Sequence, residues 1–125
     1  MALTQLSRNP YARPDAPARP PRTVEYDLLA RTTLALSQGW RRRATDFPAL
    51  AEALVENQQL WSALAADVAG PGNTLPGPLR AQLFYLYEFT VQHSRRVLEG
   101  EAGVEALVDI NTAVMKGLRG EAGAS

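Results

Sequence analysis

The side chains that could perform chemistry in this chain are few and lie far apart in the sequence. His93 is the only histidine, and the chain contains no cysteine. Paired-histidine and thiolate metal sites are therefore excluded, and no disulfide can form. His93 has no GxSxG nucleophile motif to act with, and the Glu-x-x-His pairs of di-iron bundles are absent. We therefore expect a hydrogen-bonded structural histidine in a protein that is not an enzyme and uses no cofactor.

The charged residues match solvated helix surfaces better than a reaction site. Most carboxylates fall on the polar faces of the predicted helices: Glu52, Glu56, Asp67, Glu88, Glu99 and Asp109. The run Arg41–Arg43 is interpreted as a helix C-terminus whose cations complement the helix dipole. An RNA-binding patch of Arg41–Arg43, Arg95 and Arg96 is the alternative. A formal net charge of +0 and a pI near 6.6 lend it no support, because a neutral surface does not attract nucleic acid.

Two asparagines are the most informative polar residues, because each interrupts an apolar stripe. Asn57 lies in the stripe of the second predicted helix, and Asn111 lies in that of the fourth. Burying an unpaired amide costs about 1–3 kcal/mol, so we expect both to be hydrogen-bonded to each other, to a backbone carbonyl or to water. One interpretation is a device that fixes helix register, as buried asparagines do in coiled coils. The other is that the stripe is a groove completed by a partner.

Four predicted helices position these residues. Apolar residues recur at helical spacing, and capping or turn residues mark the ends, which places the helices at residues 23–40, 46–69, 77–98 and 104–119. Thr23 and either Thr45 or Asp46 are the predicted N-caps. No strand pattern occurs, and the short links make successive helices antiparallel. We predict an all-α fold, an up-down bundle of four helices in a domain spanning residues 23–119.

The apolar stripes define the predicted core and the residues that lie outside it. Trp61 and Leu64 lie on the stripe of the longest helix, and Leu79 begins the stripe of the third. Replacing Trp61 by alanine is expected to cost about 3–5 kcal/mol. Tyr85 and Phe89 form an i, i+4 pair that projects away from the stripe. The pair is either a further buried face or an exposed contact with a partner.

The two ends of the chain are predicted to lie outside this domain. Five prolines between residues 8 and 22 favour a flexible, extended, proline-rich arm over residues 1–22. Tyr11, the large aromatic of this stretch, is a candidate partner contact if the arm docks on another protein. Residues 120–125 are expected to be a disordered tail. Because there is no signal peptide and no apolar run of about 20 residues, we expect a cytoplasmic location.

Taken together, three stretches resemble the FlaF family of flagellar biosynthesis regulators. The first holds Tyr11 and the PRTVEY segment that follows it, which is similar to the family's AY…SPRETE start. The second and most specific is NQQLWSALAADV from Asn57, followed by NTLP from Asn73 and LRAQ from Leu79. The third is DINTAVMKGL from Asp109. Order and spacing match across nearly the whole chain, although the proline-rich arm departs from the usual pattern.

The resemblance implies a cytoplasmic, non-enzymatic, chaperone-like regulator that supports flagellin synthesis and secretion. Its implied partners are flagellin and FlbT, the companion regulator of flagellin mRNA, and neither a membrane nor direct contact with nucleic acid is implied. A helical bundle with spare apolar surface could hold a helical segment of unassembled flagellin. We expect Tyr85, Phe89 and Tyr11 to provide that contact. The alternatives are direct RNA binding and a structural module that homodimerises through the aromatic pair.

Overall fold

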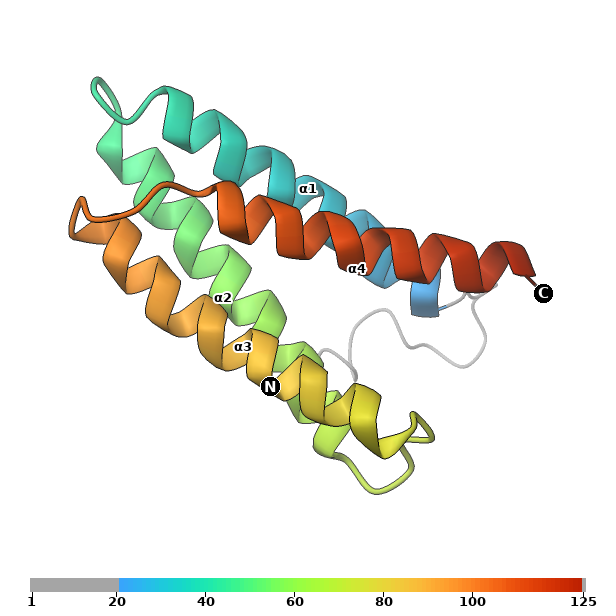
Figure 1. Cartoon of the computed structure of the whole chain (residues 1–125). Helices are drawn as coiled ribbons and strands as arrows, with labels where there is room; N and C mark the ends of the chain where they lie inside the picture. The colour runs from blue at the N-terminus through green and yellow to red at the C-terminus, as the bar shows by residue number, and fades with distance from the viewer. Residues whose placement is uncertain (1–20, 125) are drawn as a thin grey trace, which may run out of the picture.

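The computed structural model describes residues 21–124, which form four α-helices joined by short links (Figure 1). The helices are α1 (Pro21–Arg41), α2 (Phe47–Ala69), α3 (Gly77–Leu98) and α4 (Glu105–Ala124). No strand occurs within this range, so the prediction of an all-α bundle of four helices is confirmed. Residues 1–20 of the predicted arm, with Tyr11, lie outside the described residues, as does Ser125, whereas residues 21 and 22 of that arm belong to α1. Side chains are described for residues 25–117.

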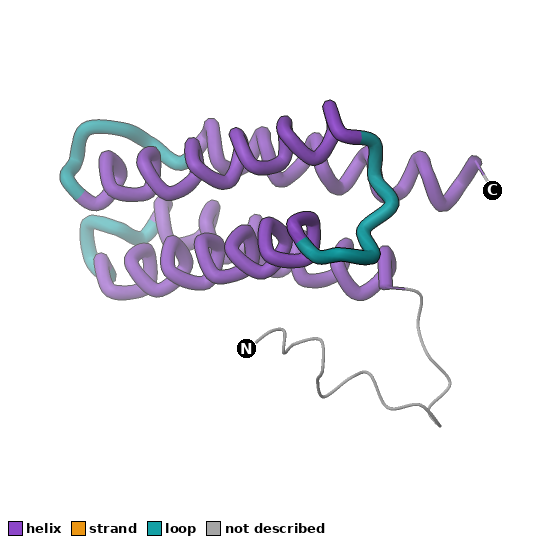
Figure 2. Tube along the Cα trace, turned by 90° about the horizontal axis from the view of Figure 1, so that it is seen from below, coloured by secondary structure: helices purple, strands orange, loops and turns teal. Residues whose placement is uncertain are grey.

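Successive helices run antiparallel, as predicted. The links at residues 42–46 and 99–104 lie at one end of the bundle, and the link at residues 70–76 lies at the other (Figure 2). Helix α1 packs against α2 and α4, and α2 also packs against α3, whereas α3 and α4 touch little. The pairs α1–α4 and α2–α3 therefore converge near the links 42–46 and 99–104 and separate towards the opposite end (Figure 1). The helices form a bundle that is closed at one end.

The helix ends follow local capping chemistry. Helix α2 is capped by Asp46, whose Oδ1 accepts a hydrogen bond of 3.2 Å from the backbone N–H of Ala49, and Pro48 occupies the first turn. Helix α1 begins at Pro21, two residues before the predicted cap Thr23, because a proline at the start of a helix loses no intrahelical hydrogen bond. Helix α4 continues past the predicted end at residue 119 to Ala124. A glycine inside a helix costs only about 1 kcal/mol, so it need not end one.

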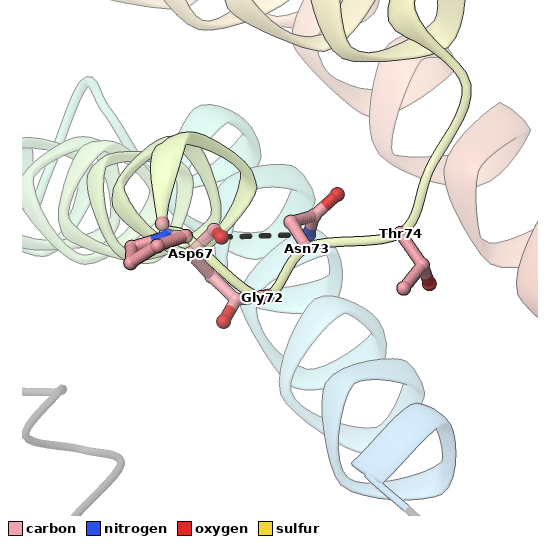
Figure 3. A pocket seen from close by; sticks show the side chains of 6 residues that line it. Asp67, Gly72, Asn73 and Thr74 are labelled. Carbon is pink, nitrogen blue, oxygen red and sulfur yellow. Dashed lines mark hydrogen bonds between the residues drawn. The ribbon is translucent and has the colours of Figure 1, made fainter.

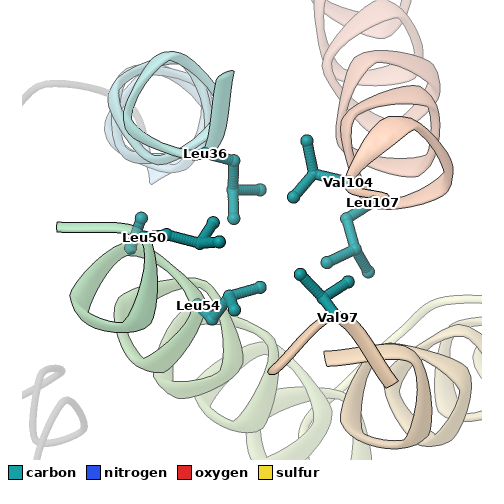
Figure 4. Close-up of a cluster of buried hydrophobic side chains, with 7 residues drawn as sticks. Leu36, Leu50, Leu54, Val97, Val104 and Leu107 are labelled. Atoms are coloured by element: carbon teal, nitrogen blue, oxygen red, sulfur yellow. The ribbon is translucent and has the colours of Figure 1, made fainter. Parts of the chain in front are cut away.

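The main hydrophobic core lies at the closed end, where side chains from all four helices point toward one another (Figure 4). Its largest members are fully or almost fully buried: Leu36, Leu50, Leu54, Val97, Val104 and Leu107. Trp40 packs against this cluster from the end of α1. Each buried leucine contributes about 1.5–3 kcal/mol relative to an exposed one, so this cluster contributes substantially to the stability of the fold.

The predicted stripe of α3 is wrong at its beginning. Leu79 is 41% exposed, and Leu83 and Leu86 are only half-buried, whereas Thr90, Ser94 and Val97 further along the helix are buried. The reason is the separation of the helix pairs: the N-terminal half of α3 leaves α4, so among the described helices only α2 packs against it. Leu64 on α2 is also half-buried, whereas its neighbours Ala65 and Val68 are buried.

The packing of α1 on α2 depends on Gly39. This glycine is buried, and a Cβ built on it would lie 2.9 Å from the Cα of Leu50 and 3.2 Å from the Leu50 backbone nitrogen. Backbone atoms at these distances cannot move aside unless α2 shifts, so only glycine permits this close approach. Because Leu50 is itself part of the core, such a shift would disturb the core packing.

We predict that Gly39→Ala lowers the free energy of unfolding by about 1–3 kcal/mol, because overpacking outweighs the gain in helix propensity. Gly117→Ala is the matched control, since Gly117 is also helical but nothing lies within 4 Å of an added Cβ. The control should raise stability by up to about 1 kcal/mol. Urea denaturation measures both changes. Equal stabilities of the two variants would show that the α1–α2 contact does not require a glycine.

Candidate functional site

A chain of buried hydrogen bonds crosses the bundle from α2 to α4. The indole N–H of Trp61 donates to Asn111 Oδ1 over 2.9 Å, and Asn111 Nδ2 donates to Asn57 Oδ1 over 2.8 Å. All three side chains are 0% exposed. Helices α2 and α4 are diagonal neighbours rather than a packed pair, so these two bonds tie together helices that otherwise touch little.

At one end of this chain of hydrogen bonds the Trp61 N–H has an acceptor, but at the other end a donor is unpaired. Asn57 Nδ2 is buried without a partner, and so are Thr90 Oγ1 and Ser94 Oγ on α3. The two asparagines are hydrogen-bonded to each other, which is one of the partnerships expected from the sequence. Because described helices enclose them completely, this arrangement favours the register role over a groove that a partner completes. A polar pairing at one fixed depth permits only one axial alignment of α2 and α4.

The two aromatic residues of the predicted pair on α3, Tyr85 and Phe89, lie in different surroundings. Tyr85 is 65% exposed, whereas Phe89 is half-buried and stacks on His93 with ring centroids 5.1 Å apart. His93 Nε2 lies 2.9 Å from the carbonyl oxygen of Gly103 and thereby holds the 99–104 link against α3. This contact was not predictable from the sequence, because nothing local in the sequence marks Gly103 as a neighbour of His93. Tyr85 is thus the more accessible member of the pair.

Two of the arginines considered for RNA binding, Arg43 and Arg96, make contacts at helix ends. The guanidinium of Arg43 lies 3.6 Å from the ring centroid of Trp40 and donates to the Trp40 carbonyl over 2.8 Å. Arg96 approaches the Glu101 carboxylate at 3.9 Å and donates to the Glu101 carbonyl over 3.4 Å. These contacts close the two links at the converged end, which agrees with the interpretation of helix C-termini.

The link between α2 and α3 forms a small hollow of ≈ 390 Å³ around Asp67 and residues 70–74. Asn73 holds it together: its Nδ2 donates to the Asp67 carbonyl over 3.4 Å (Figure 3), and its Oδ1 accepts from the backbone N–H of Leu75 over 3.0 Å. One bond joins the link to the last turn of α2 and the other lies within the link, so they account for Asn73 as a turn-forming residue.

A second hollow is a groove of ≈ 430 Å³ on the outer side of the α2–α3 pair. Its walls include Val55, Gln58 and Ser62 on α2, and Tyr87, Val91 and Leu98 on α3. This groove was not predicted from the sequence. The sequence contains only a weak indication of it: Val55 is a lone valine on a polar helix face, and apolar residues flank the stripe of α3. Only the pairing of the two helices brings them together.

Of the candidate residues from the sequence, the structure brings together Asn57, Trp61 and Asn111 but leaves the others apart. Tyr85 and Phe89 lie on α3, outside this buried group, and Leu64 is half-buried on α2. Tyr11 lies outside the described residues. Within residues 21–124, none of the helices is long and apolar enough to cross a bilayer.

Comparison with known proteins supports the resemblance seen in the sequence. A family model described as flagellar protein FlaF matches residues 7–118. The match includes all three stretches on which the resemblance was based. Comparisons with curated proteins and with solved structures found no match.

We predict that Asn111→Leu destabilises the fold more than Asn57→Leu, because Asn111 bonds both of the other side chains. Its loss leaves a buried indole N–H and a buried amide oxygen unpaired, at about 2–4 kcal/mol in total. Asn57→Leu leaves one amide donor unpaired but also removes one that has no partner, so it should cost about 1 kcal/mol or less. Urea unfolding curves measure both changes. A larger loss for Asn57→Leu would show that these hydrogen bonds do not determine the stability of this region.

Proposed function

We propose, from the premise that this chain belongs to the FlaF family of flagellar proteins, that it is a non-enzymatic factor that binds flagellin, FlbT or both and so supports flagellin synthesis and secretion. The match over residues 7–118 is the observation that carries the flagellar role. The identity of the partner and the chaperone-like, regulatory action are our inference. A cytoplasmic site of action is part of the same proposal.

The surface of α3 supports binding rather than catalysis. Phe84 and Tyr85 are 38% and 65% exposed, so two neighbouring aromatic rings face solvent on one helix. Aromatic side chains supply much of the binding energy at protein interfaces, because they bury a large area with few rotatable bonds. Unassembled flagellin presents helical segments that are covered in the filament. An exposed aromatic face could hold such a segment until assembly.

Tyr85 is a better probe of this surface than Phe89. The Phe89 ring stacks on His93, which in turn contacts the 99–104 link, so its removal would disturb the fold as well as any interface. Tyr85 makes no hydrogen bond or ring contact among the described residues. A loss of binding in a Tyr85 variant can therefore be attributed to the surface.

We predict that Tyr85→Ala weakens binding to monomeric flagellin or to FlbT by at least about tenfold, as expected when an interface aromatic is truncated. Leu34→Ala is the matched control, because Leu34 is 55% exposed but lies on α1. Biolayer interferometry with both partners measures affinity, and thermal melts should show that both variants are folded.

Two outcomes would contradict this proposal at different levels. If Tyr85→Ala binds as tightly as the unmodified protein, the surface assignment is wrong although the function stands. If the unmodified protein binds neither flagellin nor FlbT, the proposed function itself is wrong.

A further inference from the structure

The groove on the outer side of α2 and α3 is a second surface suited to a protein partner. We propose that it binds one amphipathic helix of a partner protein, with aliphatic residues seated between Val55 and Leu98 and a carboxylate facing Arg95. The inference rests on the proposed function in one respect, since it takes this protein to be a partner-binding bundle.

The length of the groove matches a short helix. Tyr87, Val91 and Leu98 line it from α3 at spacings of four and seven residues, which places them on one face. From Tyr87 to Leu98 is 11 residues, or about 16 Å at 1.5 Å per residue, which equals about three turns. Val55 and Ser62 line the opposite wall seven residues apart on α2. Two walls with heptad spacing form the kind of groove into which a third helix packs.

Two exposed aliphatic residues, one from each helix, lie where an incoming helix would pack. Val55 is 53% exposed and Leu98 is 44% exposed, and both line the groove together with half-buried Tyr87 and Val91. A single exposed aliphatic residue needs no explanation in a folded protein. Apolar residues from two helices that meet along one groove are different, because a partner can cover all of them at once.

The polar groups of the groove indicate the charge of its occupant. Arg95 is the only charged side chain among the described residues that line it, and it makes no ion pair or hydrogen bond within residues 25–117. Ser94 also lines the groove; it is only 3% exposed, and its buried Oγ has no partner. A helix that carries a carboxylate opposite Arg95 would complement the cation, and a polar side chain near Ser94 would satisfy the hydroxyl.

This groove and the Tyr85 surface lie on different sides of α3. At 3.6 residues per turn, Tyr85 projects about 120° away from Val91 and about 140° away from Leu98. A helix seated in the groove would therefore leave Tyr85 accessible. The bundle can hold two segments at once, from one partner or from two.

The test uses the full-length protein, labelled with ¹⁵N, and two synthetic 18-residue helical peptides. Both peptides carry leucines at i, i+4, i+7 and i+11, but one carries glutamates beside this stripe and the other carries lysines. We expect the glutamate peptide to bind about fivefold more tightly, which is the scale of an exposed ion pair. Its amide shift changes should map to Val55, Val91 and Leu98.

Arg95→Glu should reverse the preference between the two peptides, whereas Arg42→Glu, an exposed arginine outside the groove, should leave it unchanged. Equal binding of both peptides, shifts confined to the surface around Tyr85, or no binding would overturn the proposal. A concentration-dependent dimer in light scattering that Leu98→Glu dissociates would also overturn it, because the occupant would then be a second copy.

The flagellin and FlbT measurements are read separately from the peptide experiment. If the unmodified protein binds either partner but neither peptide, the groove assignment fails and the proposed function stands. If it binds neither partner but discriminates the peptides through Arg95, the groove assignment stands and the proposed function fails.

Discussion

The hydrogen bond between Trp61 and Asn111, extended to Asn57, is the interaction on which the geometry of the bundle depends. Hydrophobic packing at the closed end tolerates small sliding movements of one helix along another, because aliphatic contacts have little directionality. Buried hydrogen bonds do not tolerate such sliding, because a displaced donor loses its acceptor in a region without water. By joining α2 to α4 across the diagonal, these bonds set the depth at which the two helix pairs meet.

The unequal packing of the helices gives the molecule a stable end and a more open end. The leucine and valine core, Trp40 and the arginine contacts all lie where the links 42–46 and 99–104 come together. Towards the opposite end, α3 leaves α4, and its first leucines are exposed or half-buried. An isolated helix pair cannot cover its own apolar face, so the first half of α3 retains apolar surface.

The organisation of the helices agrees with the proposed role of this flagellar protein in binding other chains. The single histidine is used to hold a link, and the paired asparagines are enclosed within the bundle. What faces solvent is aromatic on one side of α3 and aliphatic, with one arginine, on the other. Helix α3 thus separates two surfaces of different chemistry. A partner could bind at either surface without changing the packing of the core.

The sequence by itself determined the four helices, a cap of the second helix at Thr45 or Asp46, the central place of Trp61 and the family, because these depend on local spacing and on residue type. It also required partners for Asn57 and Asn111, since a buried amide without one is costly. Only the tertiary structure decided that they bond each other, that Leu79 is exposed and that Val55 meets Leu98 across a groove. These outcomes depend on how far each helix pair diverges. Divergence arises from contacts between residues far apart in the chain, which periodicity within one helix does not encode.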